Sequence, residues 1–215
     1  MIQSAATKPT KTAFAKRMKT NRRLIFLNKP QLISLLRAAK AHSAKAHAMI
    51  CTAYWHGLRT SEVCGLKIKD VDFKNRTIDL ARLKGSLEHS QALAAFKGEP
   101  LLDEIRALKA WMEEREKLND HSDALFVSQK HGEMDRSTFF RLFRQIAVEA
   151  GLPEDRQHPR ILKHSLASHM ISDGVNLAVV AQSLGHMALS STYRYTGVSD
   201  ETADDARQKT IANMF

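Results

Sequence analysis

The sequence has few of the features that mark secreted or membrane proteins. Cysteine occurs twice in 215 residues, as Cys51 and Cys64, both in apolar helical surroundings. Two reduced, buried thiols are therefore expected rather than a disulfide. No apolar run approaches the roughly 18 residues that span a bilayer, and the chain does not begin with the apolar segment of a secretory signal. These absences predict a cytoplasmic protein with no membrane partner.

Sequence motifs for common cofactors are also missing. The chain has no Walker phosphate loop, no glycine-rich dinucleotide fingerprint, and no His/Cys/Asp cluster at the spacing of metal ligands. We therefore expect a protein that works without a nucleotide cofactor or a metal ion.

Acidic residues are under-represented. The chain has 23 Asp and Glu against 33 Lys and Arg, which gives a formal net charge of +10. A surplus of this size on a small domain favours a polyanionic partner, and nucleic acid is the commonest. On charge alone, the alternative is a basic protein with no such partner.

Residues 1–23 are basic, poor in apolar residues and interrupted by Pro9, so a flexible arm is expected there. Such an arm would either follow DNA phosphates or be a disordered tail. After it, apolar residues at helical spacing predict a helix starting at Asn28-Lys29-Pro30, another over 44–56 ended by Gly57, and a third from Thr60.

The pattern then changes. Alternating residues over 68–80 predict two short strands around a turn at Asn75-Arg76, with a third strand over 91–96. Further helices are expected from Pro100, from a Ser137 cap to Gly151, over 160–173 and 176–184, and in two short segments over 189–196 and 200–213, with Leu125-Phe126-Val127 as a buried strand or turn. The fold class is α+β, mainly α-helical with a small antiparallel sheet.

Two basic residues stand where they can meet an anion. Arg59 directly follows the helix-ending Gly57-Leu58 and opens the next helix, whose amides also face an anion. The alternative is a surface arginine paired with Glu62. Lys84, beside Gly85 in a turn, can reach across a groove to a phosphate, but a lysine in a turn is also an ordinary surface residue.

The C-terminal third holds more candidates. Arg160 and Lys163 are three residues apart near the start of a helix, so they share one face. His186 closes Leu184-Gly185-His186, and Tyr195 follows nine residues later. A single His or Tyr is more often structural than catalytic, so the argument depends on the order and spacing of the whole set.

That set resembles the tyrosine recombinase (phage integrase) family over about residues 24–198. The shared features are Arg-x-Ser-Glu, a hairpin Lys, a basic pair on a helix, Leu-Gly-His and the later Tyr. Within the family, the sequence is most similar to the small fimbrial phase-switch recombinases, which also have Arg-Leu-Lys at the hairpin and His-Pro before the basic helix.

The resemblance implies a role for each matched residue. Tyr195 would be the nucleophile that forms a 3′-phosphotyrosyl link to DNA. Arg59 would clamp the scissile phosphate, and His186 would orient one of its oxygens. Lys84 would protonate the departing sugar oxygen, and Glu62 would support the pocket without touching substrate. A free phenol, with a pKa near 10, needs such cationic neighbours.

The resemblance also implies double-stranded DNA as substrate, a homo-oligomer on that DNA, a location at the bacterial nucleoid and an origin in a mobile genetic element. The catalytic domain would be residues 24–198. Residues 199–215 would be a C-terminal segment exchanged between subunits or, alternatively, a frayed end. Larger relatives carry an additional N-terminal domain, so the chain is either a catalytic fragment or a minimal enzyme.

One motif departs from the family. Where members usually read His-x-x-Arg, this chain has Arg160-Ile161-Leu162-Lys163. Lys163 keeps the charge but loses the planar fork that grips two phosphate oxygens; Arg160 would supply a guanidinium from a shifted position. Three hypotheses follow: an active or slowed recombinase, an impaired relative that binds DNA and regulates or competes without cutting, and an unrelated basic DNA-binding protein.

Overall fold

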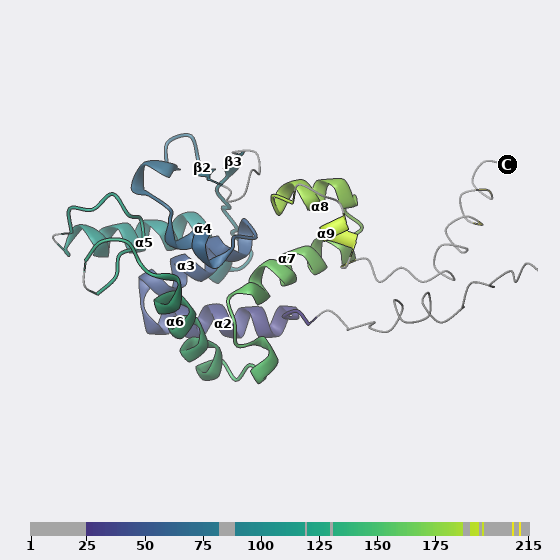
Figure 1. Cartoon of the computed structure of the whole chain (residues 1–215), viewed down its shortest axis with the longest axis horizontal. Helices are drawn as coiled ribbons and strands as arrows, with labels where there is room; N and C mark the ends of the chain where they lie inside the picture. Colours follow the sequence, from purple (N-terminus) through teal and green to yellow (C-terminus); the bar gives the residue numbers. More distant parts are fainter. Residues whose placement is uncertain are drawn as a thin grey trace, which may run out of the picture.

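The structure is a computed structural model that describes residues 25–81, 89–118, 120–129, 131–186, 190–193, 195, 208 and 211. Figure 1 shows a mainly helical molecule with a small sheet beside α4. The helices are α2 (Lys29–His42), α3 (Ala44–Trp55), α4 (Thr60–Cys64), α5 (Glu104–Glu116), α6 (Arg136–Glu149), α7 (Arg160–Ser172), α8 (Leu177–Ser183) and α9 (Ser190–Tyr193). The strands are β1 (Val71–Asp72), β2 (Thr77–Leu80) and β3 (His89–Ala92), and the 3₁₀ turns are η1 (Ile68–Asp70), η2 (Pro100–Leu102) and η3 (Glu154–Arg156).

Helix α2 begins where the sequence predicts. The Asn28 side chain accepts a hydrogen bond from the Gln31 amide at 3.0 Å, and the Gln31 side chain accepts one from the Asn28 amide at 3.1 Å. This capping box satisfies two amides at the start of the helix, and Pro30 fits there because it has no amide hydrogen to satisfy. The predicted apolar face is buried: Leu32, Leu35, Leu36 and Ala39.

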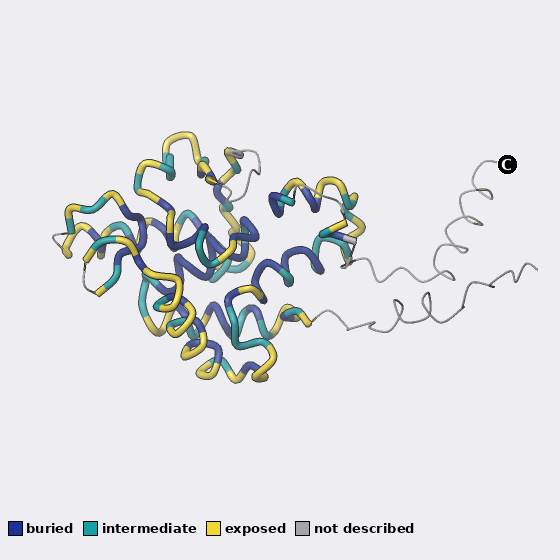
Figure 2. The backbone as a smooth tube through the Cα atoms, viewed as in Figure 1, coloured by how far each residue is buried: buried dark blue, intermediate teal, exposed yellow. Residues whose placement is uncertain are grey.

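The core is built around α3. Nine consecutive residues of this helix, 46–54, are buried, because α2, α5 and α7 pack around it. Figure 2 shows the same buried stretch in dark blue, continuing into α7. Burial of apolar surface on this scale is the main stabilising term of the fold. Cys51 and Cys64 are buried and free, as predicted.

The predicted three-stranded antiparallel sheet is confirmed, in the order β1-β2-β3, but three strand boundaries were wrong. Residues 68–70 form η1, because the Asp70 carboxylate accepts from the Lys67 amide at 2.8 Å and closes a tight turn. The third strand begins at His89 rather than at 91 and ends at Ala92 rather than at 96. Beyond it, both backbone groups of Ala94 bond to Glu104, so they cannot extend the ladder.

Two helix starts also differ from the prediction. A 3₁₀ turn occupies Pro100–Leu102, and α5 begins only after Asp103, whose side chain accepts from the Arg106 amide. The cap of α6 is Asp135, not Ser137: the Asp135 carboxylate accepts from the Ser137 amide at 2.7 Å. The buried face of α6 follows Phe139, Phe143 and Ile146, which leaves Phe140 43% exposed.

Gly57 and Gly151, the glycines predicted to end helices, do so with a positive φ, and Gly174 and Gly185 end α7 and α8 in the same way. Gly57 is also required by packing. A Cβ there would lie 2.6 Å from the Leu184 side chain, so any larger residue would push the α3–α4 turn away from the end of α8. This close approach brings Arg59 next to α7 and α8.

The described part of the chain contains no helix that is long and apolar enough to cross a membrane. Several predictions concern residues outside the described ones: the arm over 1–23, Lys84, and nearly all of 199–215.

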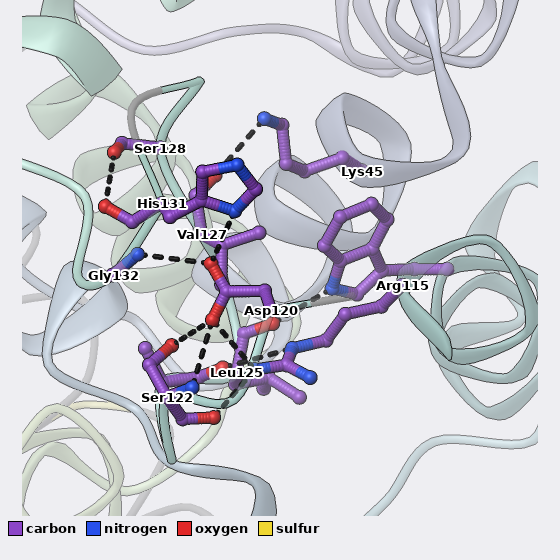
Figure 3. A network of polar contacts seen from close by, with 11 residues as sticks. Lys45, Arg115, Asp120, Ser122, Leu125, Val127, Ser128, His131 and Gly132 are labelled. Carbon is purple, nitrogen blue, oxygen red and sulfur yellow. Dashed lines mark hydrogen bonds and ion pairs between the residues drawn. The ribbon is translucent and has the colours of Figure 1, made fainter. Parts of the chain in front are cut away.

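The predicted burial of Leu125-Phe126-Val127 is confirmed, and this segment is held by a polar network between α5 and α6 (Figure 3). The Asp120 side chain is 1% exposed. Its carboxylate accepts hydrogen bonds from the hydroxyl and amide of Ser122 and from the amide of Gly132. Arg115 lies beside it and donates to the carbonyls of Ser122 and Ala124.

We expect Asp120→Asn to lower the melting temperature at pH 7. The hydrogen bonds from the Ser122 hydroxyl, the Gly132 amide and the Ser122 amide hold the pKa of Asp120 well below its usual range. The carboxylate therefore stabilises the fold fully above its unfolded-state pKa of about 3.9, and this contribution is lost as the pH falls below that value. The gap between variant and wild type should shrink below about pH 4. An equal melting temperature at pH 7, or an Asp155→Asn control with the same loss, would contradict this role.

Candidate active site

A cavity of about 350 Å³ opens between the starts of α4, α6 and α7 and the segment from α8 to Tyr195. Five of the predicted site residues line it: Arg59, Arg160, Lys163, His186 and Tyr195. Glu62 does not line the cavity but bonds to Arg59, and Lys84 lies outside the described residues. Residues more than 130 positions apart in the sequence thus meet in one place.

Arg59 is held at the mouth of the cavity by Glu62. One oxygen of the Glu62 carboxylate accepts from the Arg59 amide at 2.8 Å, and the other accepts from Nη1 at 2.6 Å. The Glu62 side chain is 2% exposed, whereas that of Arg59 is 44% exposed. The pairing considered as an alternative is therefore present, but it is anchored in the core, and it orients a guanidinium toward the cavity.

Lys163 connects α7 to the end of α8. The side chain is buried, and Nζ donates to the carbonyl of Leu184 at 2.6 Å. It thereby fixes the turn that carries Gly185 and His186. Arg160, one helical turn earlier and exposed, lines the same cavity, which confirms that the two cations share a face of α7.

His186 has a defined ring orientation. The amide of His186 donates to the carbonyl of Ala181, which ends α8, and Nδ1 lies 2.8 Å from the hydroxyl of Thr192. Thr192 is fully buried in α9. The imidazole is therefore positioned between the α8 turn and the short helix that precedes Tyr195.

The Tyr195 hydroxyl lies 2.7 Å from Nδ1 of His164, and the Tyr195 side chain is largely buried. The amide of Tyr195 donates to the carbonyl of Thr192, so the α9 turn sets its position. The predicted site residues do not include His164, although its helical spacing of four residues from Arg160 places it on the same face. They also leave out Arg136, the first residue of α6, for which no local pattern gives a signal.

The electrostatics of the cavity suit an anion. Four guanidinium or ammonium groups line it, together with two imidazoles, and none of its described lining residues is acidic. Positively charged donors that converge in this way match the oxygens of a phosphate group. The described residues include no cluster of three or more His, Cys, Asp or Glu side chains placed to hold a metal ion.

A buried polar network supports the site from behind. His56, three residues before Arg59, has Nε2 at 2.9 Å from Glu104 and Nδ1 at 2.7 Å from the Gln91 side chain. Gln91 of β3 also donates to the carbonyl of Ser183, close to the turn that carries His186. The network thus joins the sheet and α5 to both sides of the cavity.

Comparison with known proteins identifies this arrangement. A sequence profile described as "Phage integrase family" matches residues 25–202. The chain belongs to the phage integrase family. It is 31% identical over 180 residues to the type 1 fimbriae regulatory protein FimB of Escherichia coli (strain K12), covering 82% of this chain and 86% of FimB. It is 33% identical over 159 residues to the tyrosine recombinase XerA of Thermococcus onnurineus (strain NA1), covering 73% of this chain and 52% of XerA.

Solved structures of family members share the fold. A crystal structure of XerA recombinase has a TM-score of 0.71 at 25% identity, covering 86% of this chain and 65% of that one. The XerH site-specific recombinase, in a pre-cleavage complex with its difH substrate, has a TM-score of 0.70 at 29% identity, covering 87% of this chain and 55% of that one. The chain therefore spans about two thirds or less of these solved proteins. The matches confirm the predicted family, the fold and the class, tyrosine-type site-specific DNA recombinase.

Proposed function

We propose that this chain cleaves and rejoins double-stranded DNA through a covalent 3′-phosphotyrosyl link to Tyr195. The observation that carries the proposal is the position of the Tyr195 hydroxyl in a cavity lined by Arg59, Arg136, Arg160 and Lys163. A tyrosine is a weak nucleophile at neutral pH, and this surrounding of cations stabilises both its ionised form and the attacked phosphate.

In the proposed reaction, Tyr195 Oη attacks the phosphorus and the bond to the 5′ oxygen breaks. Arg59, held by Glu62, binds a non-bridging oxygen, and His186 orients the other. Each such donor contributes about 3–4 kcal/mol to transition-state stabilisation in comparable sites. Lys84 is proposed to protonate the departing 5′ oxygen. Because the phosphotyrosyl link conserves the energy of the broken bond, rejoining needs no nucleotide.

Double-stranded DNA is the proposed partner, bound by two or more copies of the chain. The +10 net charge supports a polyanionic partner, and the solved relatives include XerH bound to its difH substrate and a Tn1549 transposon integrase bound to DNA. A recombinase of this kind works at the bacterial nucleoid in the cytoplasm, and an origin in a mobile element fits the transposon integrase likeness.

A second candidate is a DNA-binding regulator that does not cut. One observation favours it: Lys163 stands where the family usually has arginine, and its Nζ donates to the Leu184 carbonyl. A lysine lacks the planar fork that binds two phosphate oxygens at once. Arg160 lines the same cavity and is proposed to supply the missing guanidinium, so cleavage remains the favoured function.

A trapping experiment distinguishes the two candidates. The probe is a pool of nicked duplexes with random sequence on both sides of the nick, from which a cleaved short strand diffuses away. We expect the wild-type chain to form an adduct that survives denaturant and whose DNA can be sequenced. Tyr195→Phe should form none. Tyr54→Phe, which removes a hydroxyl bonded to His169 outside the cavity, is the matched control and should still form it. Sequence-specific binding without any wild-type adduct would favour the regulator.

A further inference from the structure

We propose that His164 is the general base that takes the proton from Tyr195 during strand cleavage. This assignment rests on the proposed function and adds a catalytic residue to it. The Nδ1 atom of His164 lies 2.7 Å from Tyr195 Oη, within the distance at which a proton passes directly between two heavy atoms. The two rings are close, with centroids 5.6 Å apart.

The surroundings of the hydroxyl single out an imidazole for this role. Arg59, Arg136, Arg160 and Lys163 also line the cavity, but arginine and lysine are protonated at neutral pH and have no lone pair to offer. They can stabilise the phenolate and the phosphate, yet they cannot accept the proton. A neutral histidine can, and it is the side chain whose charge changes most readily near neutral pH.

The two histidines of the cavity lie on different elements and face different partners. His186 follows the end of α8, and its Nδ1 lies 2.8 Å from the hydroxyl of Thr192 in α9, which orients the ring. His164 lies within α7, so its backbone is fixed by the helix, and its Nδ1 faces the nucleophile itself. We therefore assign phosphate orientation to His186 and proton transfer from the nucleophile to His164.

The proton balance requires a specific tautomer. His164 begins neutral, with its hydrogen on Nε2 and a lone pair on Nδ1. As the bond from Oη to phosphorus forms and the bond from phosphorus to the 5′ oxygen breaks, the hydroxyl proton moves to Nδ1. The 5′ oxygen takes its proton from a separate donor, for which Lys84 is proposed. In rejoining, the 5′ hydroxyl gives its proton back to the group that supplied it, for which Lys84 is proposed, and its oxygen attacks the phosphorus. The bond from phosphorus to Tyr195 Oη breaks, and His164 returns the proton to Oη.

The test uses His164→Asn and His164→Ala on DNA recovered from the trapping experiment. Asparagine can hydrogen-bond to the tyrosine but cannot act as a base at neutral pH, so it separates orientation from proton transfer. We expect both variants to form the adduct about 10²-fold more slowly than wild type, the low end of the range for general-base catalysis. Added imidazole should accelerate His164→Ala but not Tyr195→Phe. His121→Asn, at an exposed position outside the cavity, is the matched control and should cleave at the wild-type rate.

A second substrate shows at which end of the reaction His164 acts. When sulfur replaces the 5′ bridging oxygen, the leaving thiolate needs no proton, because thiols are far more acidic than alcohols. A variant that lacks the acid is rescued by this substrate, whereas one that lacks the base stays slow. We expect His164→Asn to stay slow on the sulfur substrate and Lys84→Ala to recover.

The outcomes separate the two proposals. If wild type forms an adduct and His164→Asn cleaves as fast, or recovers fully on the sulfur substrate, the assignment of His164 is wrong while the proposed recombinase stands. If wild type forms no adduct with any DNA in the pool, the proposed function fails and the base assignment fails with it. Acceleration of His164→Ala by imidazole would itself show that this variant is folded.

Discussion

Lys163→Met is expected to slow adduct formation by about 10²–10³-fold, the loss that follows removal of one preorganised donor from a transition state. Methionine has nearly the same length as lysine and can fill the buried position between α7 and the Leu184 turn. It removes the positive charge and the donor to the Leu184 carbonyl together. The measurement is the rate of adduct formation on the recovered DNA, with wild type and variant at equal occupancy of the substrate.

Lys163→Arg is the informative companion. It keeps the charge and restores the planar fork that binds two phosphate oxygens, so cleavage should be as fast as wild type or faster. The unsatisfied Leu184 carbonyl in Lys163→Met should also cost about 1–3 kcal/mol of folding free energy, measurable by urea unfolding. If Lys163→Met cleaves at the wild-type rate and loses only stability, Lys163 is a structural clamp and not part of the phosphate site.

Most of the site could be predicted because each residue stands in a short local pattern. Arg59 follows a helix-ending glycine, and His186 follows Leu-Gly at the end of another helix, so sequence spacing fixes where each lies in its turn. The periodic burial of α2 could be predicted equally well, since it follows from the spacing of apolar residues within one helix.

The rest depends on contacts between distant elements, which local patterns do not report. His164 meets Tyr195 from 31 positions away, and Arg136 reaches the cavity from the start of α6. Strand β3 ends early because Glu104, ten residues on from Ala94, takes its amide. At the start of α6 both Asp135 and Ser137 are good caps, and the charged acceptor prevails because a carboxylate is favoured at a helix N-terminus.

Glu104→Ala is expected to lower the free energy of unfolding by about 2–6 kcal/mol, because it leaves two buried polar groups without their partner at a cost of about 1–3 kcal/mol each. Glu104 is fully buried, and its carboxylate lies 2.9 Å and 3.1 Å from Nε2 of His56 while also accepting from the Ala94 amide. The two ring nitrogens of His56 lie within hydrogen-bond distance of Gln91 and Glu104. Removing the carboxylate would leave Nε2 of His56 and the Ala94 amide buried without this partner.

Two control variants test whether this loss of stability comes from the buried carboxylate. Glu104→Gln keeps one acceptor oxygen and the shape of the side chain, so its loss should be smaller than that of Glu104→Ala. Glu113→Ala, at an exposed position of the same helix, should change stability by no more than about 0.5 kcal/mol. If urea unfolding shows that Glu104→Ala loses less than about 1 kcal/mol of unfolding free energy, the buried hydrogen bonds of Glu104 add little net stability. Because His56 and Gln91 connect this network to Arg59 and to the His186 turn, adduct formation by folded Glu104→Ala should also be slower, whereas a purely global effect would leave the rate per folded molecule unchanged.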